Sequence, residues 1–241
     1  MSATTPNPMV SPSTESTTTD LEPIMATGPR PVATRPRTVA ARVAIAAILA
    51  YQALSIAAIV ANPQWNPLTR QLSEYALGRQ SWLQIAAFLA SALSYAAVLV
   101  ALRPHIKTAA GRAGLAILAY CVLATIGVGI FVTDPLRNTP ATVSTHGVLH
   151  VVFGASALVL LPVAALLLTR SLARTHPRGY PSRRALNRIA FLPLTGFALI
   201  WIPEVSGLIP VHGWPHRILF LTYTEWVIIG TTPLARSTSD S

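Results

Sequence analysis

Charged residues are scarce in this chain of 241 residues. Only 11% of its residues are Asp, Glu, Lys or Arg, whereas a soluble domain carries about 25%. Hydrophobic residues make up 52%, and they gather in runs longer than the roughly 18 residues that mark a membrane-spanning helix. This composition excludes an ordinary soluble domain and predicts one membrane domain over residues 39–235.

Cysteine is almost absent. The single cysteine, Cys121, lies inside an apolar run, so an intramolecular disulfide and a cysteine-based metal site are both excluded. We interpret it as a small buried apolar residue. Residues 1–38 also lack an apolar run and are rich in Ser, Thr and Pro. They predict a disordered cytoplasmic tail rather than a cleavable signal peptide.

Acidic residues are few, with 8 Asp and Glu against 18 Lys and Arg, which gives a formal net charge of +10. A nucleic-acid-binding protein gathers such an excess on one soluble face. Here the basic residues lie in short loops beside apolar runs, where they determine membrane topology. The pattern therefore favours membrane topology over nucleic-acid binding.

The apolar runs predict an all-α, polytopic membrane protein with six transmembrane helices. Pro, Gly or charged clusters mark the ends of each run, as they do at helix ends. The predicted spans cover residues 39–61, 82–102, 113–132, 148–168, 188–209 and 216–234. Residues 236–241 are then a short second cytoplasmic tail.

The orientation follows from the distribution of Lys and Arg between the two sides of these spans. Fourteen fall on the side of the termini and four on the other side, at Arg70, Arg79, Arg137 and Arg217. Cytoplasmic loops carry the excess of basic residues. We therefore predict an inner (plasma) membrane protein with both termini in the cytoplasm.

A cluster of polar residues is predicted on the outward-facing side. It comes from the three outer loops and from the outer ends of the last three spans: Ser73, Glu74, Tyr75, Thr133, Asp134, Arg137, His146, His150, Glu204, His212, His216 and Arg217. His146 and His150 are four residues apart, so they share one helix face, as two metal ligands do in helical sites. Glu74, Asp134 or His212 would supply a third ligand of a zinc site with an open position. The same two His also fit simple interfacial polar residues.

Two acidic residues are predicted inside spans, Glu204 and Glu225. A carboxylate in a spanning helix is costly unless it is paired or faces water. Glu225 lies nine residues into its span, about 13 Å deep at about 1.5 Å per residue, and we expect it to face the bundle interior. Each acid could have a functional role, or it could only form an interhelical hydrogen bond that fixes the packing.

Three segments resemble the DUF998 family of prokaryotic membrane proteins. They are Leu-Ser-Glu-Tyr-Ala-Leu-Gly at 72–78, Ile-Phe-Val-Thr-Asp-Pro at 130–135 and His-Gly-Val-Leu-His at 146–150. The resemblance implies a six-span fold of unassigned activity. The positions that match the polar motifs of the family are Ser73, Glu74, Asp134, His146 and His150, whereas Glu204 and Glu225 lie outside them.

Three functional hypotheses follow. The first is a scaffold whose outer loops bind another envelope protein. The second is an outer-leaflet enzyme acting on a lipid-like substrate. In this enzyme His146 and His150 would bind a divalent metal such as zinc or act as acid and base. Asp134 would orient an imidazole or join the metal ligands, and Glu74 would be a metal ligand or a base. The third is a small proton-linked transporter that uses Glu204 and Glu225.

Overall fold

Every secondary-structure element in the described part of the chain is a helix. The computed structural model describes residue 1 and residues 35–135, 143–206 and 213–236, and its helices belong to one compact unit, residues 33–241. The helices are α1 (Arg35–Val60), η1 (Leu72–Leu77), α2 (Ser81–Leu102), η2 (Arg103–His105), α3 (Ala109–Ile130), α4 (Thr145–Thr175), α5 (Arg183–Ile189), α6 (Leu192–Ser206) and α7 (Gly213–Arg236). The two tails predicted at 1–38 and 236–241 lie largely outside the described residues.

Five of the described helices are long and apolar enough to cross a membrane, namely α1, α2, α3, α4 and α7. Each coincides with a predicted span. α1 begins at Arg35, four residues before the predicted boundary, and α4 continues to Thr175, seven residues beyond it. Large apolar side chains such as Ile56, Leu123 and Val151 are exposed on the outside of these helices, as expected where a helix contacts lipid.

The predicted fifth span, residues 188–209, differs from the structure. A turn at residues 190–191 separates the short helix α5 from α6, which has 15 described residues. Pro193 explains the break, because its ring would clash with the carbonyl group of residue 189 in a continuous helix and it has no N–H to donate. Proline is well tolerated in the first turn of a helix, so α6 starts just before it.

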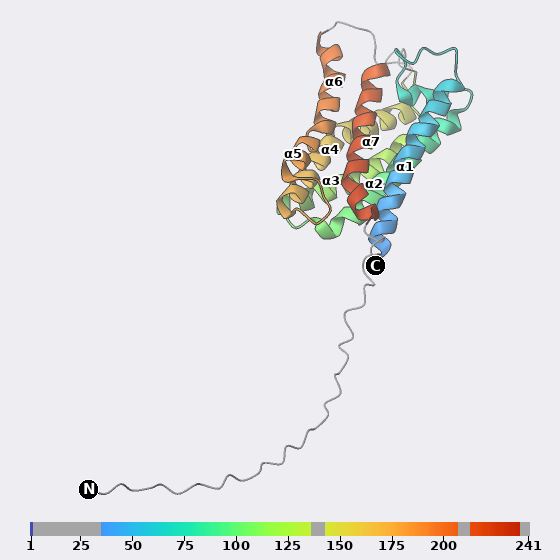
Figure 1. Cartoon of the computed structure of the whole chain (residues 1–241). Helices are drawn as coiled ribbons and strands as arrows, with labels where there is room; N and C mark the ends of the chain where they lie inside the picture. Colours follow the sequence, from blue (N-terminus) through green and yellow to red (C-terminus); the bar gives the residue numbers. More distant parts are fainter. Residues whose placement is uncertain (2–34, 136–142, 207–212, 237–241) are drawn as a thin grey trace, which may run out of the picture. The chain divides into compact units, whose positions relative to one another are not determined.

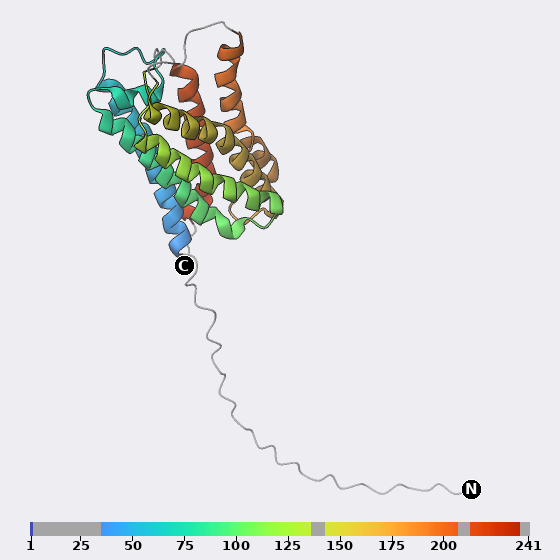
Figure 2. The same cartoon turned by 180° about the vertical axis from the view of Figure 1, so that it is seen from behind.

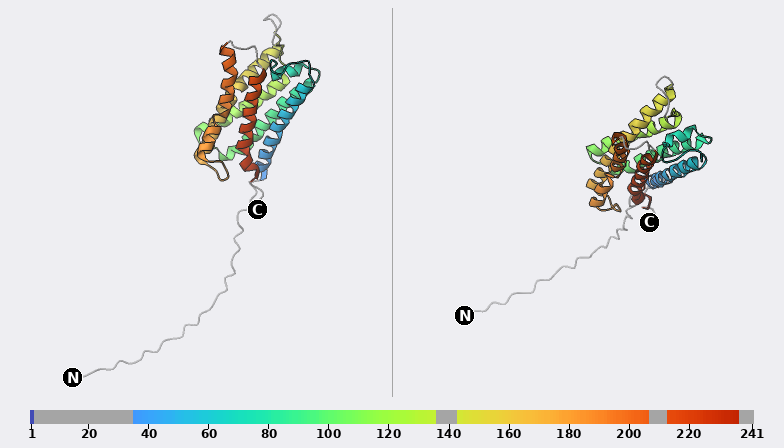
Figure 3. Two further views of the ribbon diagram at one scale, coloured as in Figure 1. Left: turned by 45° about the horizontal axis from the view of Figure 1, so that its top comes forward. Right: turned by 90° about the horizontal axis from the view of Figure 1, so that it is seen from above.

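The helices pack in the order α1, α2, α3, α4, α6 and α7, and α7 returns to contact α1. Figure 1 and both views of Figure 3 show α7 between α6 and α1. Figure 2 shows α3 and α4 side by side on the opposite face. Small buried residues, including Ala44, Ala87 and Ala164, line the contacts and let the helices approach closely. The Ser94 hydroxyl group also donates to the Ala44 carbonyl oxygen at 2.8 Å, tying α2 to α1.

Candidate functional site

The loop between α1 and α2 carries η1, and Glu74 holds it in place. The Glu74 side chain is only 1% exposed. Its carboxylate accepts hydrogen bonds from the Arg70 guanidinium group and, at 3.1 Å, from the Gln71 backbone N–H. The ion pair with Arg70 uses Oε1 of Glu74 and the backbone hydrogen bond uses Oε2, so this residue stabilises the loop.

Asp134 holds the start of α4. Its two carboxylate oxygens accept hydrogen bonds from the Ser144 N–H at 2.7 Å and the Ser144 hydroxyl group at 2.8 Å. The Ser144 oxygen in turn accepts from the Gly147 N–H at 2.9 Å, which makes Ser144 the N-cap of the helix. A Cβ atom at Gly147 would overlap the Asp134 carboxylate, so a larger residue here would displace that carboxylate from Ser144.

The two histidines of α4 have different environments. His146 is exposed, and its ring contacts the edge of Phe131 with 5.5 Å between ring centroids. His150 is 7% exposed, and its Nδ1 lies 2.7 Å from the Phe131 carbonyl oxygen. Because a carbonyl oxygen only accepts, Nδ1 carries the proton and donates. In the neutral ring Nε2 then has the lone pair.

The predicted metal ligands are not brought together. Asp134 binds Ser144, His150 binds Phe131 and His146 is turned outward. In the ranges that the structure covers, no group of three His, Cys, Asp or Glu side chains is close enough to hold a metal ion. Arg137 and His212, and the side chain of Glu204, lie outside the described residues.

Glu225 corrects another expectation. Its side chain is exposed on the outer surface of α7 and does not face the bundle interior. The side chains that α7 turns inward around it are Tyr223, Thr224 and Trp226, which are buried. Hydropathy alone does not show which face of a helix points into the bundle. The position of Glu225 depends on how α7 packs against α1 and α6.

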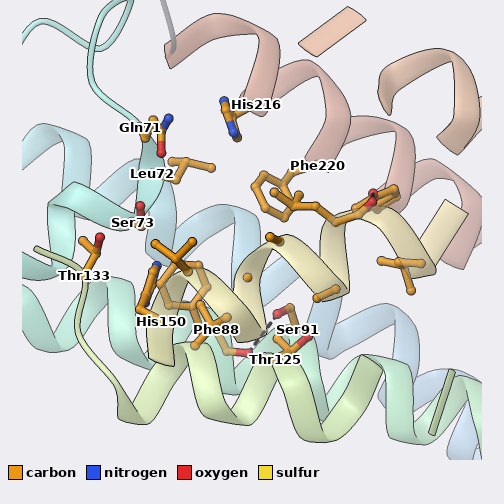
Figure 4. Close-up of a pocket in the computed structure, with 18 of the residues that line it drawn as sticks. Gln71, Leu72, Ser73, Phe88, Ser91, Thr125, Thr133, His150, His216 and Phe220 are labelled. Carbon is orange, nitrogen blue, oxygen red and sulfur yellow. Dashed lines mark hydrogen bonds between the residues drawn. The ribbon is translucent and has the colours of Figure 1, made fainter. Parts of the chain in front are cut away.

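A cavity of about 240 Å³ lies between α2, α3, α4 and α7, beneath η1. His150 and His216 line it together with Gln71, Ser73 and Thr133, which lie at the end of the bundle that carries η1. Figure 4 shows these polar residues around one part of the cavity, with Phe88 beside His150 and with Ser91, Thr125 and Phe220 also in the lining. The cavity therefore combines a polar end with a largely apolar interior.

The length of the cavity follows from the stretch of α4 that lines it. This stretch runs from His150 to Leu161, and its eleven steps of about 1.5 Å each span about 16 Å. That is about half of a hydrocarbon core about 30 Å thick. Among the described residues that line the cavity, none is Asp, Glu, Lys or Arg. The space is thus long, narrow and uncharged.

The model of a family described as "Protein of unknown function (DUF998)" matches residues 44–232, well over half of the chain. The chain belongs to this family. The match spans α2, α3 and α4 and all of α7 except its last four residues, so the cavity lies within the DUF998 region. Comparison with curated proteins and with solved structures gives no match to either.

Four residues of the predicted polar cluster, Ser73, Thr133, His150 and His216, line the DUF998 cavity, but the sequence did not predict the polar residues of its interior. Ser91, Tyr95, Thr125 and Tyr223 line the cavity from within helices. Polar side chains inside apolar spans were a usable signal for them, because such residues are placed where they find partners or line a cavity. Their convergence from three different helices depends on packing.

Proposed function

We propose that this DUF998 protein crosses the inner membrane six times, with both termini in the cytoplasm, and binds a lipid-like molecule from the outer leaflet. α6 would be the sixth span beside the five long apolar helices. The arginine distribution supports the orientation, which makes the end of the bundle that carries η1 the outer end.

The orientation is tested with single-cysteine variants. In a Cys121→Ala background, a membrane-impermeant maleimide should label Arg79→Cys from outside spheroplasts and should reach Arg184→Cys only after lysis. Both arginines are exposed, so both introduced thiols are accessible on their own side. Labelling in the reverse order would overturn the proposed topology.

The observation that carries the ligand proposal is the cavity, which is polar at one end, apolar along about half a bilayer thickness and free of charge in its described lining. Ligand sites are typically apolar clefts with a few placed polar groups. A single apolar chain with an uncharged, hydrogen-bonding end group matches this space. The head group would lie at His150, Ser73 and Thr133, and the chain beside Phe88 and Leu158.

The surface of α4 supports entry from the side. Val151 lines the cavity and is also 60% exposed, and Ala155 is both lining and exposed. The cavity therefore reaches the outer face of α4, which would contact the membrane. A lipid-like molecule could pass along α4 without its apolar chain crossing water.

His150 is the residue that we assign to the polar end of the ligand. With Nδ1 donating to Phe131, Nε2 is the atom that accepts a proton or a hydrogen bond. It would accept from a ligand hydroxyl group in a binding protein, and it would act as a base in an enzyme on the same lipid-like molecule. The transporter hypothesis gains no support from Glu225, because this side chain is exposed on the surface of α7 and does not face the bundle interior. The scaffold hypothesis concerns the outer loops alone.

The proposal is tested by native mass spectrometry of the protein purified in mild detergent. Wild type should retain about one lipid-like molecule per chain. His150→Gln should lose most of it, because the longer, flexible side chain does not hold its amide oxygen where the imidazole ring holds Nε2. His146→Gln, a matched change one turn away on the exposed face, should retain it. A wild type without bound lipid, or equal retention in both variants, would overturn the proposal.

A further inference from the structure

Arg217 reaches from the first turn of α7 under the loop between α1 and α2. Its Nη1 donates to the Arg70 carbonyl oxygen at 3.0 Å. The guanidinium carbon lies 5.8 Å from the centroid of the Tyr75 ring, within the range of a cation–π contact. Nearby, the Gly213 N–H donates to the Leu68 carbonyl oxygen at 3.0 Å. The guanidinium group is therefore held in a fixed orientation by the docked loop.

The remaining polar atoms of this guanidinium group are buried and unused. In the described part of the chain, neither Nε nor Nη2 of Arg217 has a hydrogen-bond partner. These two atoms form one edge of the planar fork, the edge that binds a carboxylate or phosphate through two parallel hydrogen bonds. Burying a cation without a counter-charge costs free energy, and buried polar atoms normally have hydrogen-bond partners. This edge is therefore expected to bind a group that the protein itself does not supply.

Other buried polar groups near Arg217 also lack a hydrogen-bond partner of good geometry in the described part of the chain. The hydroxyl groups of Tyr51, Ser55 and Tyr75 are buried and, within the described ranges, none makes a hydrogen bond of good geometry, although Tyr51 lies beside Ser55 and Tyr75 lies beside Arg217. Tyr51 and Tyr75 both lie close enough to Arg217 to interact with it electrostatically. Burial raises the pKa of the Tyr75 phenol, so this hydroxyl group stays protonated at neutral pH and can donate. The acid nearby, Glu74, is already paired with Arg70.

We infer that the Nε and Nη2 edge of Arg217, with the Tyr75 and Tyr51 hydroxyl groups, binds an oxyanion, either a phosphate or a carboxylate group. Arg217 supplies the positive charge and two parallel donors, and the phenols supply further donors. Apart from Tyr75, the loop contributes its Arg70 carbonyl oxygen, which positions the guanidinium group. None of Arg217, Tyr75 and Tyr51 lines the cavity, so this site is distinct from that of the lipid-like ligand.

The first test is thermal unfolding in a phosphate-free detergent, with sodium phosphate compared with sodium chloride at equal ionic strength. At a hundredfold excess over its Kd, phosphate should raise the Tm of wild type by about 5 °C or more. Arg217→Lys keeps the charge and loses the two-donor edge, so its phosphate response should fall at least threefold. Arg79→Lys, an exposed arginine at the same end of the bundle, should respond as wild type does.

A second comparison identifies the source of the oxyanion. Wild type and Arg217→Lys are placed in nanodiscs of phosphatidylglycerol or of the phosphate-free lipid monogalactosyldiacylglycerol. If a lipid head group fills the site, phosphatidylglycerol should stabilise wild type selectively and remove its response to added phosphate. If a free anion fills it, the response should persist in both lipids.

The inference fails if wild type shows no difference between phosphate and chloride and none between the two lipids, since water alone then satisfies the buried groups. It also fails if Arg217→Lys responds as wild type does. Should Arg217→Lys not fold, the comparison of anions and lipids on wild type still decides. Loss of the lipid-like ligand from the cavity in the His150→Gln variant leaves this result unaffected, so the two proposals can fail separately.

Discussion

Gly154→Leu is expected to lower the retention of the lipid-like ligand at least tenfold without destabilising the protein. Gly154 lines the cavity from α4, and a Cβ atom there meets only the Val128 side chain, at an ordinary contact distance of 3.7 Å. A leucine would extend into the space of about 240 Å³ that the ligand needs. Leucine also favours a helix more than glycine does, by up to about 1 kcal/mol. Retained lipid per chain is measured by native mass spectrometry, and stability by thermal unfolding.

Gly230→Leu is the matched control for this substitution. Gly230 lies on α7 away from the cavity, and a Cβ atom there meets nothing within 4 Å. This variant should retain the ligand as wild type does. If Gly154→Leu instead lowers the free energy of unfolding by the roughly 1–3 kcal/mol typical of an overpacked core, the space at Gly154 is not an open cavity. If it folds and still retains the ligand, the ligand binds elsewhere.

Glu74→Ala is expected to lower the free energy of unfolding by about 2–3 kcal/mol, because hydrogen bonds to charged groups contribute about 1.5–3 kcal/mol each. The substitution removes the buried carboxylate that joins Arg70 to the Gln71 N–H. The value lies below that for a fully buried pair, since the Arg70 side chain is 36% exposed and regains water. Unfolding by SDS titration in mixed micelles measures the change.

The double variant Arg70→Ala/Glu74→Ala gives the interaction free energy of the pair by a double-mutant cycle. Because the two side chains act together, the double variant should be little less stable than Glu74→Ala alone. A Glu74→Ala protein that keeps the stability of wild type but loses its ligand would assign Glu74 to ligand binding instead of to the stability of the loop.

The positions of the long helices could be predicted from sequence because each span is bounded by residues with strong local effects. Arg103 and Pro104 end α2, and the apolar run after Thr108 places α3. The far end of α4 was missed because the apolar run stops at residue 168, whereas the helix runs on to Thr175, whose hydroxyl group donates to the Ser171 carbonyl oxygen. The break before Pro193 was a local signal that the long apolar run obscured.

The candidate site was predictable only where contacts are local. The pair Arg70–Glu74 is only four residues apart, and the short turn that leads into η1 brings the two side chains together. By contrast, the contact of His150 with the Phe131 carbonyl oxygen spans 19 residues and depends on how α3 packs against α4. The spacing of His146 and His150 indicated a shared face, yet the environment of each ring is set by Phe131 and by the cavity.

The most direct test of a lipid-binding cavity is to map where a photoreactive monoacylglycerol, with a diazirine in its acyl chain, crosslinks to wild type in membranes. The acyl chain should label peptides that contain residues 151–161 of α4 and 220–223 of α7, which line the cavity. This labelling should be competed by unlabelled monoacylglycerol and be absent in Gly154→Leu. Labelling spread over the exposed apolar residues of α1 and α3, such as Ile56 and Leu123, with no preference for the cavity, would contradict the account.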